Sequence, residues 1–168
     1  MPGTRPTAER TREALFSIWQ ERMPGARFLD LFCGSGAAGL EALSRGAGSA
    51  VLVDADGKAL AVAARNRDRL QAQVCRTVRA ALPAGLASAL LGEESFDLIF
   101  ADPPYAFEHW QELLEAVEAR LAESGEAVIE HTARAELPGR VSSIERVETR
   151  RYGETALSFY RRSGSARD

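Results

Sequence analysis

The sequence predicts an α/β protein with a doubly wound, mostly parallel sheet of seven strands that is closed by an antiparallel hairpin toward its C-terminal end. Between residues 26 and 130, short apolar runs typical of buried strands alternate with longer segments of helical periodicity. After residue 130, two strand-like segments follow each other without a helical segment between them, which is typical of an antiparallel pair. The alternation predicts parallel strands joined by helices, and the final pair predicts the hairpin.

The individual elements follow from these patterns in chain order. Residues 8–22 carry an apolar stripe at helical spacing, and Pro24-Gly25 ends that helix. Strands are predicted at 26–32, 50–53, 74–78, 96–101, 126–130, 141–149 and 155–161. Helices are predicted at 40–45, at 57–73 with Leu70 on the buried face, in a weaker segment through residue 91, and at 108–123. We expect a single domain, with an N-terminal helical segment at 1–25, a core at 26–162 and a mobile tail at 163–168.

Length and composition limit the classes of protein that fit this chain. It has 168 residues, 45% of them hydrophobic, which suits one globular domain with its own core. It has no apolar run long enough for a membrane span and no apolar N-terminal stretch typical of a signal peptide. Its two cysteines belong to no clustered Cys/His pattern. We therefore expect a cytoplasmic, reduced protein without a metal ion or a membrane partner, and we take it to be a monomer.

A glycine-rich turn lies between the first predicted strand and the helix at 40–45. Its sequence, Cys33-Gly34-Ser35-Gly36-Ala37-Ala38-Gly39, has Gly-x-Gly-x-x-Gly spacing. Gly34 and Gly36 allow a tight turn and a close approach of the backbone to a ligand, and Gly39 lets the helix pack closely on the sheet. Asp54 ends the next strand, eighteen residues after Gly36, where a carboxylate suits the hydroxyls of a ribose. This order predicts a Rossmann-like fold that binds an NAD-type dinucleotide or S-adenosylmethionine.

Four further polar residues have alternative roles. Asp30 either orders the glycine turn or contacts an amino group of the cofactor. Cys33 is expected to be a packing residue, since no activating base lies near it. His109 and His131 are expected to be exposed or structural, because neither belongs to a nucleophile arrangement, although His131 follows a strand end and could line the cleft.

The segment Asp102-Pro103-Pro104-Tyr105 follows directly after the predicted strand at 96–101. Each proline has a fixed φ and no N–H, and each disfavours a helical conformation of the residue before it, so the loop is stiff and extended. The Asp102 carboxylate and a nearby carbonyl could both accept hydrogen bonds from the exocyclic amine of a base, which localises the nitrogen lone pair for attack. Tyr105 offers a stacking face. The alternative is a rigid turn, but ligands bind at the carboxyl ends of strands in such sheets.

Charge is unevenly distributed along the chain. The formal net charge is −3, which disfavours a wide nucleic-acid-binding surface. Residues 1–27 have five Arg against three Glu, residues 134–168 have eight Arg against five acidic residues, and the middle has eight basic against sixteen acidic residues. The basic ends could place positive charge beside a site for a cationic sulfonium cofactor, although ordinary solvated arginines explain the same distribution.

Together these segments resemble class I S-adenosylmethionine-dependent methyltransferases, and specifically the RsmD family of bacterial 16S ribosomal RNA guanine-N2 methyltransferases. The resemblance covers nearly the whole chain. It rests on Arg5-Pro6-Thr7 with Arg12-Glu13-Ala14-Leu15-Phe16, on 29–36 and 39–47, on Asp102-Pro103-Pro104-Tyr105, and on Tyr152-Gly153-Glu154-Thr155. Many amino-group methyltransferases share the glycine and Pro-Pro motifs, and the N-terminal and late segments narrow the match.

The resemblance implies S-adenosylmethionine as the cofactor. It implies guanine 966 of the 16S RNA, in the small ribosomal subunit or its assembly intermediate, as the target. The implied cofactor-binding residues are Asp30, Phe32, Gly34, Ser35, Gly36, Asp54 and Asp102. The implied catalytic residues are Asp102, Pro103 and Tyr105, and the implied substrate-binding residues are Arg5, Pro104 and Tyr105. In such an enzyme the amine attacks the sulfonium methyl in line, so catalysis is mainly orientation and hydrogen bonding.

Two positions depart from the family pattern. Family members usually carry a basic β-hairpin before the Arg-Pro-Thr segment, where this chain has four residues. We therefore expect part of that RNA-binding surface either to be missing or to be replaced by the basic C-terminal segment. Ala80 stands where the family tends to have Asp or Asn to hold the adenine amine, so a backbone group would have to take that role.

Other functions are compatible with the same residues. The Asp102 loop would also serve adenine-N6 methylation of RNA or DNA, because Asp102 does not separate adenine from guanine. Protein-glutamine methyltransferases use a related loop with Asn in place of Asp102, so Asp102 favours a base over a glutamine side chain as the target. An NAD(P)-dependent oxidoreductase would use the glycine turn and Asp54, but it leaves the Pro-Pro loop unexplained. A non-catalytic RNA-binding assembly factor is a third interpretation, which the intact Asp102 and glycine turn disfavour.

Overall fold

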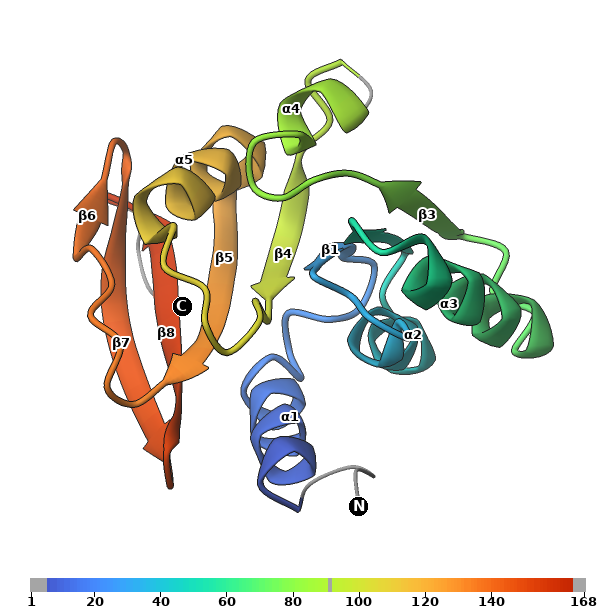
Figure 1. Cartoon of the computed structure of the whole chain (residues 1–168), viewed down its shortest axis with the longest axis horizontal. Helices are drawn as coiled ribbons and strands as arrows, with labels where there is room; N and C mark the ends of the chain where they lie inside the picture. Colours follow the sequence, from blue (N-terminus) through green and yellow to red (C-terminus); the bar gives the residue numbers. More distant parts are fainter. Residues whose placement is uncertain (1–5, 91, 165–168) are drawn as a thin grey trace.

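The computed structural model describes residues 6–90 and 92–164, which form one eight-stranded sheet with helices on both faces (Figure 1). The strand order is β3-β2-β1-β4-β5-β8-β7-β6. The strands are β1 (Arg27–Leu31), β2 (Ser49–Asp54), β3 (Cys75–Arg79), β4 (Phe96–Ala101), β5 (Leu121–Thr132), β6 (Arg140–Val141), β7 (Ile144–Tyr152) and β8 (Thr155–Arg162). The five neighbouring strands β3, β2, β1, β4 and β5 pair in parallel. β8, β7 and β6 extend the sheet beyond β5 by antiparallel pairs. The predicted α/β class with a closing antiparallel hairpin is confirmed.

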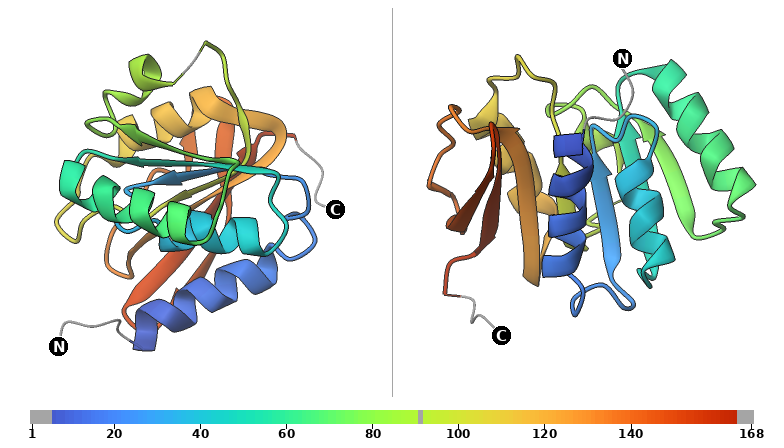
Figure 2. Two further views of the ribbon diagram at one scale, coloured as in Figure 1. Left: turned by 90° about the vertical axis from the view of Figure 1, so that its right-hand side faces the viewer. Right: turned by 90° about the horizontal axis from the view of Figure 1, so that it is seen from below.

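The helices cover the two faces of the sheet (Figure 2). They are α1 (Pro6–Ile18), α2 (Ala37–Ser44), α3 (Gly57–Arg69), α4 (Leu86–Ala89) and α5 (Trp110–Arg120). Because side chains alternate along a strand, Phe28 packs with α1, α2 and α3 on one face, and Leu29 packs with α4 and α5 on the other. Each face therefore has its own buried core. Among the described residues, no helix is both long and apolar enough to cross a bilayer.

A buried polar contact ties the segment after α1 to the sheet. Trp19 donates from Nε1 to Oε1 of Glu126 on β5 over 2.8 Å. The other carboxylate oxygen of Glu126 pairs with Nε of Arg161 on β8. All three side chains are buried. Because a buried charge is costly without partners, this contact satisfies groups that the core would otherwise leave unpaired.

The sheet has one strand more than predicted, because the segment at 141–149 is not continuous. Its start forms the short strand β6, and β7 begins only at Ile144. Between them, Ser142 has a positive φ of 52°, a left-handed conformation that interrupts an extended strand. The hairpin of β7 and β8 turns between Tyr152 and Thr155, as predicted, with Gly153 at a φ of 65°. Most of the predicted tail, at 165–168, lies outside the described residues.

Three helix ends also differ from the prediction. The first helix was predicted to reach residue 22, whereas α1 ends at Ile18. α3 ends at Arg69, and Gln71 has a positive φ of 56°, which a helix cannot continue through. Leu70 is 62% exposed, so its predicted place on the buried face is wrong. α5 ends at Arg120, because Leu121 already pairs with β4 as the first residue of β5. The predicted strand at 126–130 is therefore the inner part of a longer strand.

The carboxyl ends of the parallel strands meet at one edge of the sheet. The register pairs Leu31 at the end of β1 with Val53 of β2 on one side and with Ala101 of β4 on the other. Asp54 and Asp102 come directly after Val53 and Ala101, so the two predicted site carboxylates flank the end of β1. The strand order reverses here, and such a switch point leaves a crevice outside the strand ends.

Candidate functional site

The glycine turn forms one side of the candidate site, and its backbone requires the glycines. Phe32, Gly34 and Gly36 have positive φ angles of 60°, 55° and 84°. A Cβ on Gly36 would lie 2.8 Å from Cδ1 of Leu52, and a Cβ on Gly39 would lie 2.1 Å from Cδ2 of the same leucine. These two glycines therefore let α2 pack against β2. A Cβ on Gly34 would meet nothing within 4 Å, so Gly34 faces open space.

Asp54 is held against this turn. Its carboxylate accepts hydrogen bonds from the N–H groups of Gly34 and Asp56, each over 2.9 Å. The side chain is only half-buried, beside the open space at Gly34. An ionised carboxylate has about four acceptor positions, so Asp54 keeps capacity for further donors. The arrangement can bind hydroxyl groups, which is the chemistry of a ribose site.

Asp30 is buried within β1 and holds the start of α2. Its Oδ2 accepts a hydrogen bond from the N–H of Gly39 over 3.0 Å. Burial raises the pKa of Asp30 to about 7; the hydrogen bond from Gly39 opposes this shift, and the charges of Asp102 and Asp54 add to it. Of the two roles that the sequence leaves open, ordering the turn is the one that this hydrogen bond shows.

Replacing Asp30 with asparagine is expected to make the protein more stable, relative to the wild type, as pH rises. The pKa of Asp30 is raised in the folded state, so its contribution to stability is present below the unfolded pKa of about 3.9 and is lost as pH rises through about 7. Asparagine still accepts from Gly39 and stays uncharged. Urea unfolding of both proteins at about pH 5.5 and about pH 8.5 measures the effect. A difference in unfolding free energy that stays constant between these conditions would contradict it.

The loop Asp102-Pro103-Pro104-Tyr105 leaves β4 beside the glycine turn. The N–H of Asp102 donates to the last carbonyl of β1 over 3.2 Å, and the carbonyl of Pro104 accepts from the N–H of Phe107 over 2.9 Å. Pro103 is buried, whereas Tyr105 is 88% exposed. The carboxylate of Asp102 is exposed on one side, yet the protein around it raises the pKa of Asp102 to about 6.

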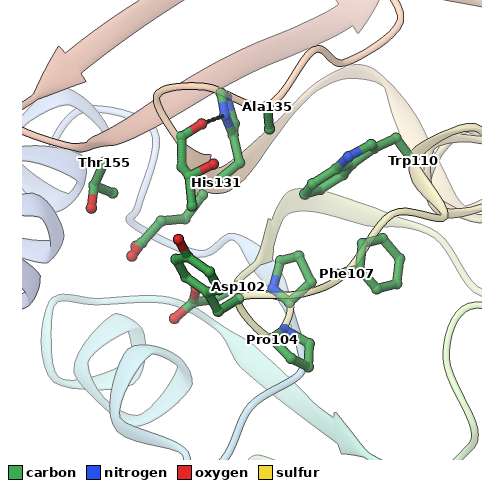
Figure 3. Close-up of a pocket in the computed structure, with 11 residues that line it drawn as sticks. Asp102, Pro104, Phe107, Trp110, His131, Ala135 and Thr155 are labelled. Atoms are coloured by element: carbon green, nitrogen blue, oxygen red, sulfur yellow. Dashed lines mark hydrogen bonds between the residues drawn. The ribbon is translucent and has the colours of Figure 1, made fainter.

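Two pockets meet at this loop. The outer pocket has a volume of about 230 Å³ and is lined by residues 102–105, Phe107, Trp110, residues 130–132, Ala135 and Thr155 (Figure 3). The inner pocket, of about 100 Å³, is lined by Arg12, Asp30, Phe32, Cys33, Ala37, Ala38, Phe100, Asp102 and Glu130. Asp102 and Glu130 line both pockets. Their carboxyl groups therefore lie where a group bound in one pocket would meet a group bound in the other.

An aromatic row runs from the glycine turn along the outer pocket. The ring centroids are 5.4 Å apart for Phe32 and Phe107, 5.0 Å for Phe107 and Trp110, and 6.2 Å for Trp110 and His131. All three contacts are edge-to-face, a favourable arrangement of packed rings. Figure 3 shows Trp110 and His131 across the pocket from Asp102. The row gives the pocket an apolar side that packing holds in place.

His131 has hydrogen-bond partners at both ring nitrogens. Nδ1 lies 2.7 Å from the carbonyl oxygen of Thr132, and Nε2 lies 2.7 Å from Oγ of Ser158. Because a carbonyl only accepts, Nδ1 carries the proton, and in the neutral ring Nε2 accepts from Ser158. Burial lowers the pKa of His131, which favours this neutral form. His131 lines the outer pocket, and its hydrogen bonds show a structural role.

The structure places the site residues implied by the resemblance in three groups. Asp102, Pro103, Pro104 and Tyr105 line the outer pocket, and Asp30, Phe32 and Asp102 line the inner pocket. Gly34, Ser35 and Gly36 lie in the adjacent turn, and Asp54 ends β2 beside it; none of the four lines either pocket. Ser35 is exposed, and its carbonyl accepts from Nδ2 of Asn66 over 3.1 Å. Arg5 lies outside the described residues.

Several lining residues were not indicated as site residues by the sequence, among them Arg12, Phe107, Trp110, Glu130 and Thr155. One of them had a usable signal. Glu130 is the last residue of the predicted strand at 126–130, just as Asp54 is the last residue of its own strand, and a carboxylate at such a position faces the crevice. The others come from α1, from the loop before α5, from the first residue of α5 and from β8, and only the packing of these segments brings them to the site.

Two further expectations concern the adenine-binding position at Ala80 and the presence of a metal site. Ala80 is buried, and its N–H donates to the carbonyl of Asp54 over 3.1 Å, so no side-chain acceptor replaces the Asp or Asn of the family pattern at this position. Within residues 6–90 and 92–164, no three His, Cys, Asp or Glu side chains form a group that could hold a metal ion.

The chain is similar in sequence to known proteins over most of its length. The family model described as "Conserved hypothetical protein 95" matches residues 1–161. The chain is 35% identical over 165 residues to "Putative rRNA methyltransferase YlbH" of Bacillus subtilis, across 96% of this chain and 90% of that protein. It is 38% identical over 104 residues to ribosomal RNA small subunit methyltransferase D of Escherichia coli, across 62% of this chain. That second match spans about half of the relative's length, 51%.

Solved structures share the fold over nearly the whole chain. The "Putative methyltransferase" of Escherichia coli has a TM-score of 0.79 at 30% identity and is matched over 96% of this chain and 89% of its own. A hypothetical protein of Thermus thermophilus has a TM-score of 0.78 at 36% identity, with 95% and 89% covered. The chain therefore belongs to the conserved hypothetical protein 95 family, which is the RsmD family that its motifs resemble, and it has the fold of the class I methyltransferases.

Proposed function

We propose that this protein transfers a methyl group from S-adenosylmethionine to the exocyclic N2 of a guanine in the 16S RNA of the small ribosomal subunit. The observation that carries the proposal is the position of Asp102 between the two pockets. An amine that donates to Asp102 from the outer pocket faces the inner pocket, which the glycine turn bounds. The names of the relatives, a ribosomal RNA small subunit methyltransferase among them, support ribosomal RNA as the substrate.

The residues around the glycine turn fit this cofactor. Gly34 opens onto free space beside the Asp54 carboxylate, which can accept from both ribose hydroxyls. The inner pocket is lined by three carboxyl groups, those of Asp30, Asp102 and Glu130, and by one guanidinium group, that of Arg12. A bound sulfonium cation would favour the ionised form of these carboxyl groups, and their negative charge would in turn stabilise it. S-adenosylmethionine would supply an electrophilic methyl group there. Asp54 would bind the ribose, and Gly34 and Gly36 would hold the methionyl part.

The outer pocket fits a base. Asp102 would accept a hydrogen bond from the target amine and fix its orientation toward the methyl group, so most of the rate gain would come from positioning. Tyr105 is 88% exposed, so its ring is free to stack on an entering base, a contact of about 1–3 kcal/mol. A base paired in folded RNA would have to be turned out of its helix to reach Asp102.

Transfer of a labelled methyl group tests this function. Tritiated S-adenosylmethionine is offered with unmodified small subunits, with naked 16S RNA and with DNA, and the labelled base is mapped. We expect label at N2 of one guanine in the 16S RNA, whether naked or within the subunit. Label at N6 of an adenine would show that the enzyme is an adenine-N6 methyltransferase and not a guanine-N2 methyltransferase. An absence of label from all three substrates would contradict the proposal.

A binding measurement separates methyl transfer from hydride transfer. Calorimetry with S-adenosylhomocysteine and with NAD compares the two adenosine-containing ligands that the glycine turn and Asp54 could hold. We expect S-adenosylhomocysteine to bind more tightly. Preferential binding of NAD would favour an oxidoreductase instead. Tight binding of S-adenosylhomocysteine without methyl transfer to any RNA would favour a non-catalytic assembly factor.

A further inference from the structure

Glu130 and Asp102 form a pair of carboxyl groups at the junction of the two pockets. The register of β4 and β5 pairs Ala101 with Ile129, and Asp102 and Glu130 are the residues that follow. They therefore lie next to each other, Asp102 just after the end of β4 and Glu130 two residues before the end of the parallel strand β5. They are also the two residues that line both pockets. A target amine bound at Asp102 would consequently also lie near the carboxyl group of Glu130.

The charged and titratable groups around Glu130 come from several elements. In the inner pocket, Glu130 shares the lining with Arg12 of α1, Asp30 of β1 and Cys33 of the turn after β1. In the outer pocket, it shares the lining with Tyr105 of the loop after β4 and with His131 of β5 itself. Asp102 lines both pockets. On β8 the pairing partner of Glu130 is the apolar Leu157. Arg12 already pairs with Glu41 over 3.3 Å, so it is shared between two carboxylates. The surroundings thus contain more negative than positive charge.

This environment raises the pKa values of both carboxyl groups. Burial is the main cause that raises the pKa of Glu130 to about 8, the neighbouring Asp102 charge adds to the shift, and Arg12 opposes it. Although Asp102 is exposed at the surface, the protein that replaces water around part of its carboxyl group raises the pKa of Asp102 to about 6. Neighbouring carboxyl groups of this kind titrate as a pair, as they do where one acts as an acid or a base.

The other titratable groups of the junction are engaged or unsuited to receive a proton. His131 uses both ring nitrogens, with Thr132 and Ser158 as partners. Asp30 is buried and accepts from Gly39. Burial raises the pKa of the Cys33 thiol far above its usual range, so it stays uncharged. Glu130 is the half-buried carboxyl group that remains beside Asp102.

We propose that Glu130 is a second catalytic residue, which accepts the proton that the target amine loses during methyl transfer; this inference rests on the proposed function. A bond forms between the amine nitrogen and the methyl carbon, and the bond from that carbon to sulfur breaks, leaving its electron pair on sulfur. The nitrogen keeps the electron pair of one N–H bond, and that proton passes to a Glu130 oxygen. Asp102 keeps its hydrogen bond to the other N–H, and solvent takes the proton from Glu130 when the outer pocket empties.

The pH dependence of Glu130→Gln tests this role. Glutamine keeps the size of the side chain but cannot accept the proton, so it mimics protonated Glu130. Single-turnover methylation rates are measured from about pH 6 to about pH 9. We expect the ratio of the wild-type rate to the Glu130→Gln rate to be near one at the acidic end and to rise to at least ~10 at the basic end. Any titration of the RNA cancels in this ratio, and a structural role would give a ratio independent of pH.

Two controls keep the result interpretable. Glu136→Gln makes the same chemical change at an exposed residue that lines neither pocket, and its ratio is expected to stay near one at every pH. Glu130→Asp keeps a carboxylate and is expected to restore part of the rise with pH. A flat ratio for Glu130→Gln with an active wild type overturns the inference alone. A wild type that methylates no RNA overturns the inference and the proposed function together.

A titration without substrate tests the pair independently of activity. Carboxyl carbons of glutamate are observed by NMR in the wild type and in Asp102→Asn. Removal of the Asp102 charge is expected to lower the pKa of Glu130, because that charge is one cause of its elevation. An unchanged pKa would show that the two groups are not coupled and would overturn the inference, even if Glu130→Gln failed to fold.

Discussion

Asp102→Ala is expected to reduce turnover by at least ~100-fold, the scale for removing one acceptor or donor that is fixed toward the transition state. Asp102 lies between the two pockets at the end of β4, where it would hold the target amine in line with the methyl group. Alanine removes the acceptor and leaves both prolines of the loop in place. Methyl transfer to the RNA substrate at saturating cofactor measures the effect. Binding of S-adenosylhomocysteine, followed by calorimetry, should change much less.

Asp68→Ala provides the matched control for this variant. The same substitution is made at a side chain that is 71% exposed, on α3, away from both pockets. Its turnover is expected to remain near that of the wild type. Near-normal turnover of Asp102→Ala would mean that the Pro-Pro loop is only a rigid turn. A large loss of cofactor affinity in Asp102→Ala would instead assign Asp102 to cofactor binding.

Glu126→Ala is expected to lower the free energy of unfolding by about 3–5 kcal/mol, the range measured when one partner of a buried ion pair is removed. Glu126 is 2% exposed and accepts from Trp19 while it pairs with Arg161. Without it, the buried guanidinium of Arg161 has lost its counter-charge and the indole N–H has lost its acceptor. Urea unfolding at neutral pH measures the difference, with the slope of the transition checked for two-state behaviour.

The surface pair of Arg67 and Asp68 serves as the comparison for this second variant. Its atoms approach to 3.0 Å, but the Asp68 side chain is 71% exposed, and exposed pairs contribute about 0–1 kcal/mol. Asp68→Ala should therefore change stability far less than Glu126→Ala. Equal losses in the two variants would show that burial does not determine the strength of the Glu126 contact.

Local patterns in the sequence indicated one half of the candidate site. The glycine turn, Asp54 and the Asp102 loop each follow a strand directly, and their roles depend on neighbours within a few residues or on the end of the same strand. These residues can therefore be recognised from short segments of the sequence. Gly39 illustrates this, because its missing Cβ was expected for close packing and a Cβ would in fact lie 2.1 Å from Leu52.

Long-range packing determines the other half, and the sequence could not show it. Thr155 begins β8 and reaches the outer pocket because β8 lies beside β5 in the sheet. Trp110 begins α5 and reaches it because its ring packs against those of Phe107 and His131. Arg12 reaches the inner pocket because α1 packs on the face that contains Phe28. The prediction of strand ends failed for a different reason. The break at Ser142 depends on one left-handed residue that is neither Gly nor Asn, so residue preferences gave no signal for it.

The place of β8 in the sheet also has a consequence for synthesis on the ribosome. β8 follows β7 in the chain, yet it lies between β5 and β7 and contributes Thr155 to the outer pocket. While residues up to Tyr152 are being made, β5 has a neighbour only in β4, and its free edge is open to wrong pairing. The nascent chain therefore carries an incomplete pocket until Arg162 has left the exit tunnel. Emergence of the N-terminal elements, the usual first step of folding during translation, cannot by itself produce an active enzyme.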